Sequence, residues 1–224
     1  SESEEPFTSA QTNVMHTFAH FLALQLVNVS RQEERIEFGK ISKELEIAQD
    51  IQASLLPSKW PEVEGYTIAG KCNTSRNVSG DFFDVIYHET DPDKVLLVIA
   101  DVMGKGVPAS IFAAIFRSLV RSSTELFEHP AELMRKLNRS MFQDLSGVDM
   151  FITAQIAYCD LRHRIMRISN AGHCPLLLTS KDETMPVTSH SPEGLPLGVV
   201  KRPELEELKI DVPKGVRVLM YTDG

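Results

Sequence analysis

Three aspartates stand beside apolar runs, and their carboxylates are the groups in this sequence best suited to chemistry. Asp101 follows residues 95–100 (VLLVIA), Asp223 follows residues 216–222, and Asp81 lies upstream within residues 78–85 (VSGDFFDV). Carboxylates at the ends of buried strands are costly unless positive charge lies among them. Hard divalent cations that take oxygen ligands meet this need. The pattern therefore predicts a metal site.

Each segment taken alone also fits a plainer interpretation. Residues 101–106 (DVMGKG) are typical of a strand end, a glycine-bearing turn and a helix start, and the Walker spacing of a phosphate loop is absent. Asp84 offers a second carboxylate near Asp81, but residues three apart on an extended chain point to opposite faces. We therefore expect Asp81 and Asp84 not to be equal ligands of one ion unless the chain bends.

The sequence offers no convincing side-chain nucleophile with a partnered base. Cys174 follows His173 directly, but adjacent residues in a strand-like stretch point apart, so we expect a structural role there. Divalent cations among the carboxylates could instead acidify a bound water molecule, which would remove the need for a nucleophilic side chain.

Composition narrows the class of protein. The formal net charge is −8 and no Lys/Arg block is present, which argues against nucleic acid as a partner. The three cysteines are scattered without C-x-x-C spacing, as in a reducing compartment. The acidic start is unlike a signal peptide, and no apolar run reaches transmembrane length. We expect a cytoplasmic protein with no membrane partner.

A long helix precedes the motifs, because residues 12–56 contain no proline and only one glycine. Its apolar residues recur at alternating intervals of three and four, which indicates a heptad seam with one polar position. Two alternatives stay open: the helix packs on its own domain, or it pairs with a second copy and joins an upstream module to the downstream domain. The seam positions are Phe38, Ile41, Leu45, Ala48, Gln52 and Leu55.

The rest of the chain shows strand patterns, then two helix patterns, then strand patterns again, which predicts an α+β fold with sheets covered by helices. Helices are expected at 108–123 and 130–145, where apolar residues share one face. Strands are expected at 66–72, 82–88, 94–100, 151–160, 164–169, 175–178, 208–212 and 216–221.

Six motifs in a fixed order resemble one family. They are residues 80–84 (GDFFD), 101–109 (DVMGKGVPA), 150–153 (MFIT), 170–175 (NAGHCP), 194–198 (GLPLG) and 221–224 (YTDG). Together they resemble the bacterial PPM (PP2C-like) serine phosphatases of the SpoIIE/RsbU type. Residues 44–57 (ELEIAQDIQASLLP) resemble the linker helix of that family, and residues 13–35 more weakly resemble the last helix of a GAF-type sensor.

The resemblance implies a sandwich of two antiparallel sheets flanked by helices. It also implies two Mn²⁺ or Mg²⁺ ions bridged by water, and hydrolysis of phosphoserine or phosphothreonine on a small regulatory protein, typically a STAS-type anti-sigma-factor antagonist. Asp81, Asp101 and Asp223 match the catalytic metal ligands, and the carbonyl of Val102 matches a backbone ligand. The element that gates metal binding in regulated members matches Gly104, Lys105, Gly106, Val107, Pro108 and Ala109.

On this basis we expect a helical linker over residues 1–57 that forms a homodimer and a phosphatase domain over 58–224. Ser79, Met103 and Lys105 depart from the family pattern, and Lys105 would place a positive charge near the ions or the substrate phosphate. The family pattern continues past residue 224 to another metal-binding aspartate, so a chain ending at Gly224 is expected to bind one metal well, two weakly or none. A non-catalytic pseudophosphatase and a phosphatase of small phosphorylated molecules are the alternatives.

Overall fold

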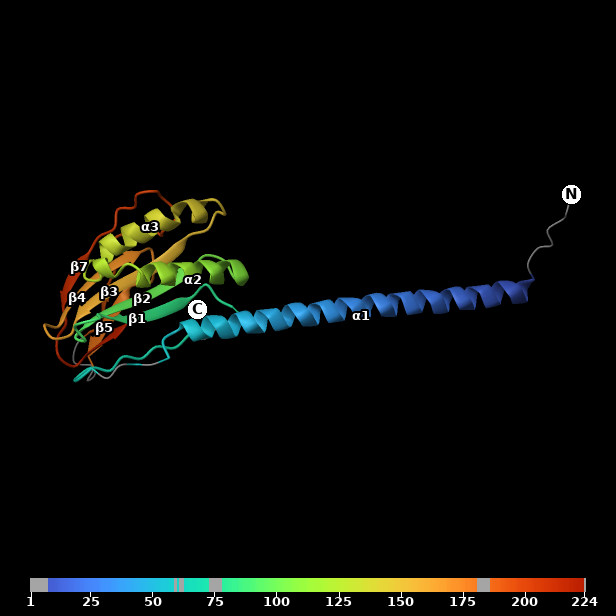
Figure 1. Ribbon diagram of the computed structural model, residues 1–224, viewed down its shortest axis with the longest axis horizontal. Coiled ribbons are helices and arrows are strands. Elements are labelled where there is room, and N and C mark those ends of the chain that lie inside the picture. The colour runs from blue at the N-terminus through green and yellow to red at the C-terminus, as the bar shows by residue number, and fades with distance from the viewer. Residues whose placement is uncertain (1–7, 59, 61–62, 73–77, 181–185, 224) are drawn as a thin grey trace. The chain divides into compact units, whose positions relative to one another are not determined.

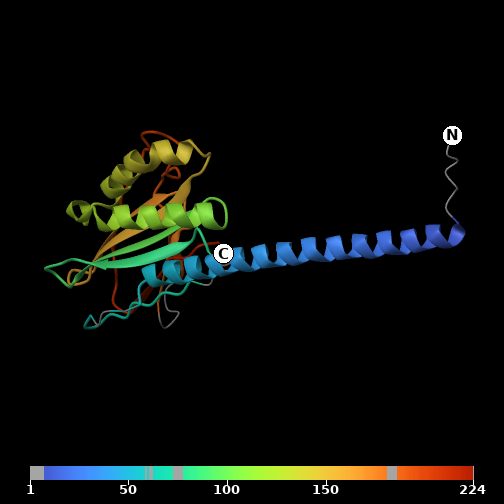
Figure 2. The same cartoon turned by 45° about the vertical axis from the view of Figure 1, so that its right-hand side comes forward.

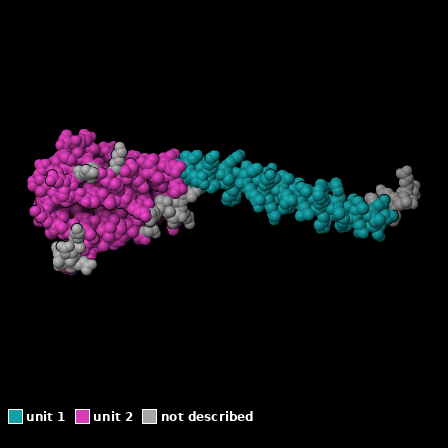
Figure 3. Space-filling view, turned by 90° about the horizontal axis from the view of Figure 1, so that it is seen from below, with its two compact units in different colours: residues 1–47 teal, residues 48–224 magenta. Residues whose placement is uncertain are grey.

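The computed structural model describes residues 8–58, 60, 63–72, 78–180 and 186–223. These fall into two compact units, Ser1–Ile47 and Ala48–Gly224 (Figure 3). Residues 73–77 of the expected turn and Gly224 of the last motif lie outside the described residues. No helix in the described ranges is long and apolar enough to cross a membrane.

The first unit contains most of helix α1. This helix spans Ser9–Leu55, so its last residues belong to the second unit. None of the described residues of α1 is buried. Many of its large apolar side chains are exposed, among them Phe18, Leu26 and Phe38. Most of the stability of a helix in water comes from burying its apolar face, and among the described residues 8–47 only Leu45 is partly covered.

The second unit holds two antiparallel sheets and two long helices (Figures 1 and 2). The first sheet has the strand order β1-β2-β3-β4-β7 and the second has the order β6-β5-β8. The predicted α+β fold is confirmed. The strands are β1 (Phe82–Tyr87), β2 (Lys94–Val102), β3 (Ile152–Asp160), β4 (Ile165–Ala171), β5 (Leu176–Ser180), β6 (Thr188–His190), β7 (Leu208–Asp211) and β8 (Val216–Leu219). The helices are α2 (Val107–Arg121), the short 3₁₀ helix η1 (Thr124–Leu126) and α3 (Pro130–Ser146).

Alternation along the strands produces two cores. Leu96 of β2 belongs to a cluster with Phe116 of α2 and Leu133 of α3, which lies between the first sheet and the helices. Its neighbour Val95 belongs to a second cluster that includes Leu176 of β5. Successive side chains of a strand point to opposite faces, so β2 contributes side chains to both cores.

Two strand predictions need correction. Residues 66–72 do not form a strand, and only an isolated bridge joins Val63 to Tyr66. Side-chain contacts fix this segment instead, because the Tyr66 hydroxyl donates to the carbonyl oxygen of Leu161 and Gly70 lies against the Phe83 ring. Strand β6 was not predicted, since its three residues are polar and show no apolar alternation.

Candidate active site

The three predicted aspartates line one cavity of about 580 Å³ in the second unit. They come from three separate segments: Asp81 directly precedes β1, Asp101 is near the end of β2, and Asp223 follows β8. The structure therefore brings together side chains that are up to 142 positions apart in sequence, from Asp81 to Asp223. The fold concentrates negative charge at one end of the sheets.

Strand register explains why Asp81 lies beside Asp101. Strands β1 and β2 pair in antiparallel fashion with Phe82 opposite Ala100, so the next position on each strand places Asp81 opposite Asp101. Directly opposite residues of an antiparallel pair project to the same face. The residues between Asp81 and Asp101 thus form a hairpin, which brings the two aspartates side by side.

Burial and neighbouring carboxylates raise the pKa values of this pair. The pKa of Asp101 rises to about 6, mainly through burial and then through the carboxylates of Asp81 and Asp223. Burial also raises the pKa of Asp81, although its hydrogen bond with Asp101 acts in the opposite direction. A positive charge in the cavity would relieve both effects.

The donor atoms of the cavity are of the kind that hard cations bind. Carboxylate oxygens are the ligands that Mg²⁺ and Mn²⁺ prefer. Within the described ranges, however, no three His, Cys, Asp or Glu side chains are grouped so that they alone could hold an ion. Val102 is buried and is not among the residues that line the cavity, although its carbonyl oxygen faces Gly80. Such ions commonly complete their coordination with backbone oxygens and water.

The predicted switch segment borders the same cavity. Gly104, Lys105 and Gly106 line it, and α2 begins directly afterwards at Val107. Gly104 and Gly106 have φ angles of 97° and 76°, which side chains with a Cβ rarely adopt. Among the described residues, Lys105 is the only lysine or arginine of the lining. Pro108 and Ala109 continue the first turn of α2, where Ala109 is buried.

The sequence did not reveal the role of His173 and Thr153. Both line the cavity, and His173 Nδ1 lies 2.8 Å from Thr153 Oγ1 while its Nε2 lies 3.1 Å from the carbonyl oxygen of Tyr221. A carbonyl oxygen only accepts, so Nε2 donates and Nδ1 accepts from the hydroxyl. Burial lowers the pKa of His173, which favours this neutral form. The ring therefore ties β3 to the segment that ends in Asp223.

Cys174 also lines the cavity, although we expected it and His173 to point apart as neighbours on a strand. That expectation assumed an extended chain. Strand β4 ends at Ala171, and Gly172 then turns the backbone with a φ of 67° before β5 begins. The chain is bent at this point, so the alternation of a strand does not apply to the pair.

Asp84 lies apart from the cavity, as the spacing predicted. Its side chain is 1% exposed and takes a bidentate pair of hydrogen bonds from Arg121, at 2.6 and 2.7 Å. Arg117 Nε lies 3.1 Å from the same carboxylate without the alignment of a hydrogen bond. Both arginines belong to α2, so their ion pairs with Asp84 hold α2 against β1.

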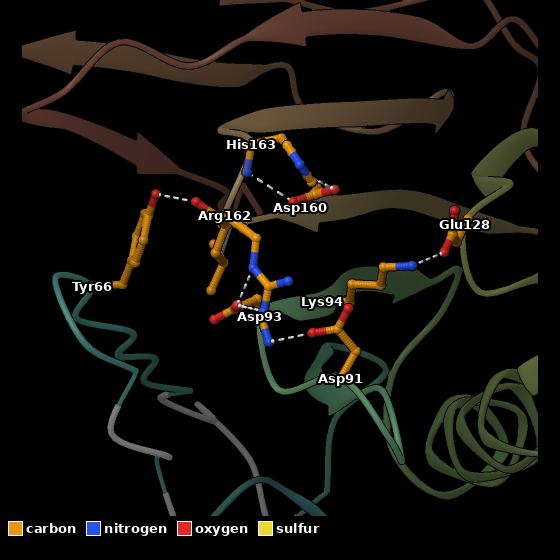
Figure 4. Close-up of polar contacts among 9 residues, drawn as sticks. Tyr66, Asp91, Asp93, Lys94, Glu128, Asp160, Arg162 and His163 are labelled. Carbon is orange, nitrogen blue, oxygen red and sulfur yellow. Dashed lines mark hydrogen bonds and ion pairs between the residues drawn. The ribbon is translucent and has the colours of Figure 1, made fainter.

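A second polar cluster lies at the opposite end of the β1–β2 hairpin (Figure 4). Its ion pairs are Lys94–Glu128, Arg162–Asp93 and His163–Asp160. Arg162 and His163 are exposed, the other four side chains are partly covered, and none of the six lines the cavity. Exposed pairs of this kind contribute little to stability.

Comparison of the sequence with known proteins identifies a family and several relatives. The family profile described as Stage II sporulation protein E (SpoIIE) matches residues 91–224. The chain belongs to the SpoIIE family. Among its relatives, phosphoserine phosphatase RsbU of Bacillus subtilis is 26% identical over 226 residues, which cover 99% of this chain and 66% of RsbU. Phosphoserine phosphatase RsbP of the same organism is 28% identical over 187 residues, covering 81% of this chain and 45% of RsbP.

Solved structures show the same SpoIIE-type fold. The SiaA PP2C domain of Pseudomonas aeruginosa has a TM-score of 0.63 at 18% identity, covering 80% of this chain and 70% of that one. The PP2C domain of SpoIIE from Bacillus subtilis, with a fragment of its regulatory domain, has a TM-score of 0.53 at 21% identity, covering 66% of this chain and 42% of that one. The chain thus spans about two thirds of RsbU and less than half of RsbP.

Proposed function

We propose that this chain is a metal-dependent protein phosphatase that removes phosphate from serine or threonine of a regulatory protein. One observation supports this above all: three aspartates from distant segments line one cavity in a chain of the SpoIIE family. The names of RsbU and RsbP as phosphoserine phosphatases agree with it. A STAS-type phosphoprotein in the cytoplasm is the substrate class that we propose.

The chain's own residues would bind Mn²⁺ or Mg²⁺ and orient the phosphate. Asp81, Asp101 and Asp223 would hold the ions through carboxylate oxygens, with the carbonyl of Val102 as a further ligand. When bound, such ions supply an acidified water molecule and positive charge for the phosphoryl oxygens. Three carboxylates without cations would repel a phosphate dianion, so the same charges that bind metal also make substrate binding depend on it.

Neighbouring residues would keep this arrangement in place. Lys105 brings a positive charge to the cavity edge, where it would attract the substrate phosphate. Neutral His173 holds the carbonyl of Tyr221 and so sets the position of Asp223. No side chain needs to act as a nucleophile, which fits the raised pKa of the Cys174 thiol.

The linker over residues 1–57, which contains α1, would be dimeric and would control the phosphatase domain. Phe38 and Ile41 of the predicted seam are 77% and 50% exposed, and their burial against a second copy would remove apolar surface from water. Leu45, Ala48 and Leu55 are partly covered within this chain. An upstream sensor would then act through the linker on the switch segment, residues 104–109.

A phosphoserine substrate tests the proposed function directly. We expect phosphate release from a phosphoserine STAS-type protein in the presence of Mn²⁺, measured on the longest natural chain that contains these residues. Asp101→Asn should reduce the rate at least about 100-fold, because the site loses a ligand at the reacting centre. Equal rates for the two proteins, or release from phosphorylated metabolites alone, would contradict the proposal. Mn²⁺ binding without hydrolysis would favour a pseudophosphatase.

A further inference from the structure

One side chain of α1 is bonded to the segment that carries Asp81. Gln52, near the end of the helix, donates from Nε2 to the carbonyl oxygen of Ser79 at 2.6 Å. In return, the Ser79 N–H donates to Gln52 Oε1 at 2.9 Å. The amide thus uses its donor and its acceptor on one backbone residue, two positions before Asp81. A side chain bonded in this way fixes both the distance and the orientation of that backbone.

The other side of the same segment is fixed by the end of β2. The Val102 N–H donates to the carbonyl oxygen of Gly80 at 3.3 Å. A Cβ on Gly80 would lie 2.5 Å from the carbonyl oxygen of Val102, so the two backbones are in close contact. The Asp81 N–H also donates to Ser79 Oγ at 3.1 Å. Residues 79–81 are therefore held between α1 and the strand that carries Asp101.

The contact also changes the interpretation of the predicted seam. Gln52 was assigned to the seam as its one polar position, but its amide is already engaged with Ser79. Leu56, directly after α1, packs against the core between the first sheet and the helices. The last turn of α1 is thus anchored to the catalytic domain, while Phe38 and Ile41 further back along the helix are exposed.

We infer that Gln52 is a positioning residue that couples α1 to the metal site by holding Ser79 and, through it, Asp81. The inference rests on the proposed function. A turn of α1 about its axis by one residue, roughly 100°, would carry the amide away from Ser79 and break both hydrogen bonds. Asp81 would keep its hydrogen bonds with Asp101 and Thr222, but Ser79, to which its N–H is bonded, would no longer be held by α1. The state of the linker would in this way determine how well the cavity binds cations.

Amide hydrogen exchange and Mn²⁺ binding test this coupling in the longest natural chain. Gln52→Leu removes both hydrogen bonds, and Gln52→Glu keeps only the acceptor for the Ser79 N–H. Gln49→Leu is the matched control, because Gln49 lies about one turn earlier on α1 and its side chain has no hydrogen bond to any described residue. Circular dichroism and the melting temperature establish that each variant is folded.

We expect Gln52→Leu to speed exchange in a peptide covering residues 78–82 at least fivefold, with or without metal. The Kd for Mn²⁺ should rise about tenfold, as expected for the loss of two hydrogen bonds of ordinary net strength. At saturating Mn²⁺, kcat should stay within threefold of wild type. Gln52→Glu should lie between wild type and Gln52→Leu, and Gln49→Leu should match wild type.

Two results would overturn the inference. One is unchanged exchange over residues 78–82 in a folded Gln52→Leu variant; the other is a Kd for Mn²⁺ that Gln49→Leu shifts as much as Gln52→Leu does. The proposed function fails by a different result, which is absence of phosphoserine hydrolysis by the wild-type protein. In that case the exchange measurement still decides whether Gln52 holds the Asp81 segment.

Discussion

Replacing Asp84 by asparagine tests how β1 holds the helix that follows the switch segment. The carboxylate is almost fully buried and faces two arginines of α2, Arg117 and Arg121. The substitution keeps the size of the side chain but removes its negative charge. Two guanidinium groups are then left beside a neutral amide, and burial already lowers the pKa of Arg117.

The structure sets the expected size of the effect. Breaking a buried ion pair by removing one partner costs about 3–5 kcal/mol. The side chain of Arg121 is 42% exposed and can turn toward water, whereas that of Arg117 is only 17% exposed. We therefore expect a loss near the lower limit, about 3 kcal/mol. For a domain of this size that corresponds to a fall in Tm of roughly 6–12 °C.

Asp93→Asn provides a matched control, since Asp93 also pairs with an arginine. Its partner Arg162 is 64% exposed, so the loss should stay below about 1 kcal/mol. Urea unfolding followed by circular dichroism measures both free energies of unfolding. A drop for Asp84→Asn no larger than that for Asp93→Asn would refute the reasoning, because burial would then not determine the strength of the pair.

Three further predictions concern the cavity and the core. Gly80→Ala should weaken Mn²⁺ binding and lower kcat/KM about 100-fold, because its Cβ would meet the Val102 carbonyl at 2.5 Å and displace Asp81. The control Gly39→Ala, whose Cβ would have no neighbour within 4 Å, should leave Mn²⁺ binding and kcat/KM unchanged. Since the pKa of Asp101 is raised to about 6, Mn²⁺ must displace a proton from this carboxyl group below that pH. Calorimetry should therefore show an affinity for Mn²⁺ that falls roughly tenfold per pH unit below about 6 and levels off above it. An equal Kd at pH 5 and pH 8 would contradict this prediction. Cys159, buried and with its pKa raised to about 12, should resist iodoacetamide at pH 8 until urea unfolds the protein, and labelling in the folded state would contradict its burial.

The sequence predicted those parts of the fold that depend on local pattern. The absence of proline over residues 12–56 predicted α1, and the continuous apolar run before Asp101 predicted a buried strand. Strand β6 escaped prediction because its residues are polar and its pairing depends on β5. Residues 66–72 were assigned to a strand wrongly, since their composition resembles a strand. Their contacts with other segments, such as the bond from the Tyr66 hydroxyl to the Leu161 carbonyl, are made through side chains and not through a backbone ladder.

The candidate site was predictable in its carboxylates but not in the residues that hold them. Asp81, Asp101 and Asp223 follow or precede apolar runs, a signal that the sequence carries by itself. The bond from Gln52 to Ser79 joins positions 27 apart, and the bond from Thr153 to His173 joins positions 20 apart. Neither pair has a local pattern, because only the strand register and the end of α1 bring the partners together.

Anomalous diffraction from crystals grown with Mn²⁺ tests the central claim most directly. Data collected at the manganese edge would locate the ions without reference to activity. The account predicts anomalous peaks within about 2.5 Å of carboxylate oxygens of Asp81 and Asp101, and loss of those peaks in Asp101→Asn. Crystals of an active, Mn²⁺-dependent protein whose peaks lie away from these carboxylates would contradict it.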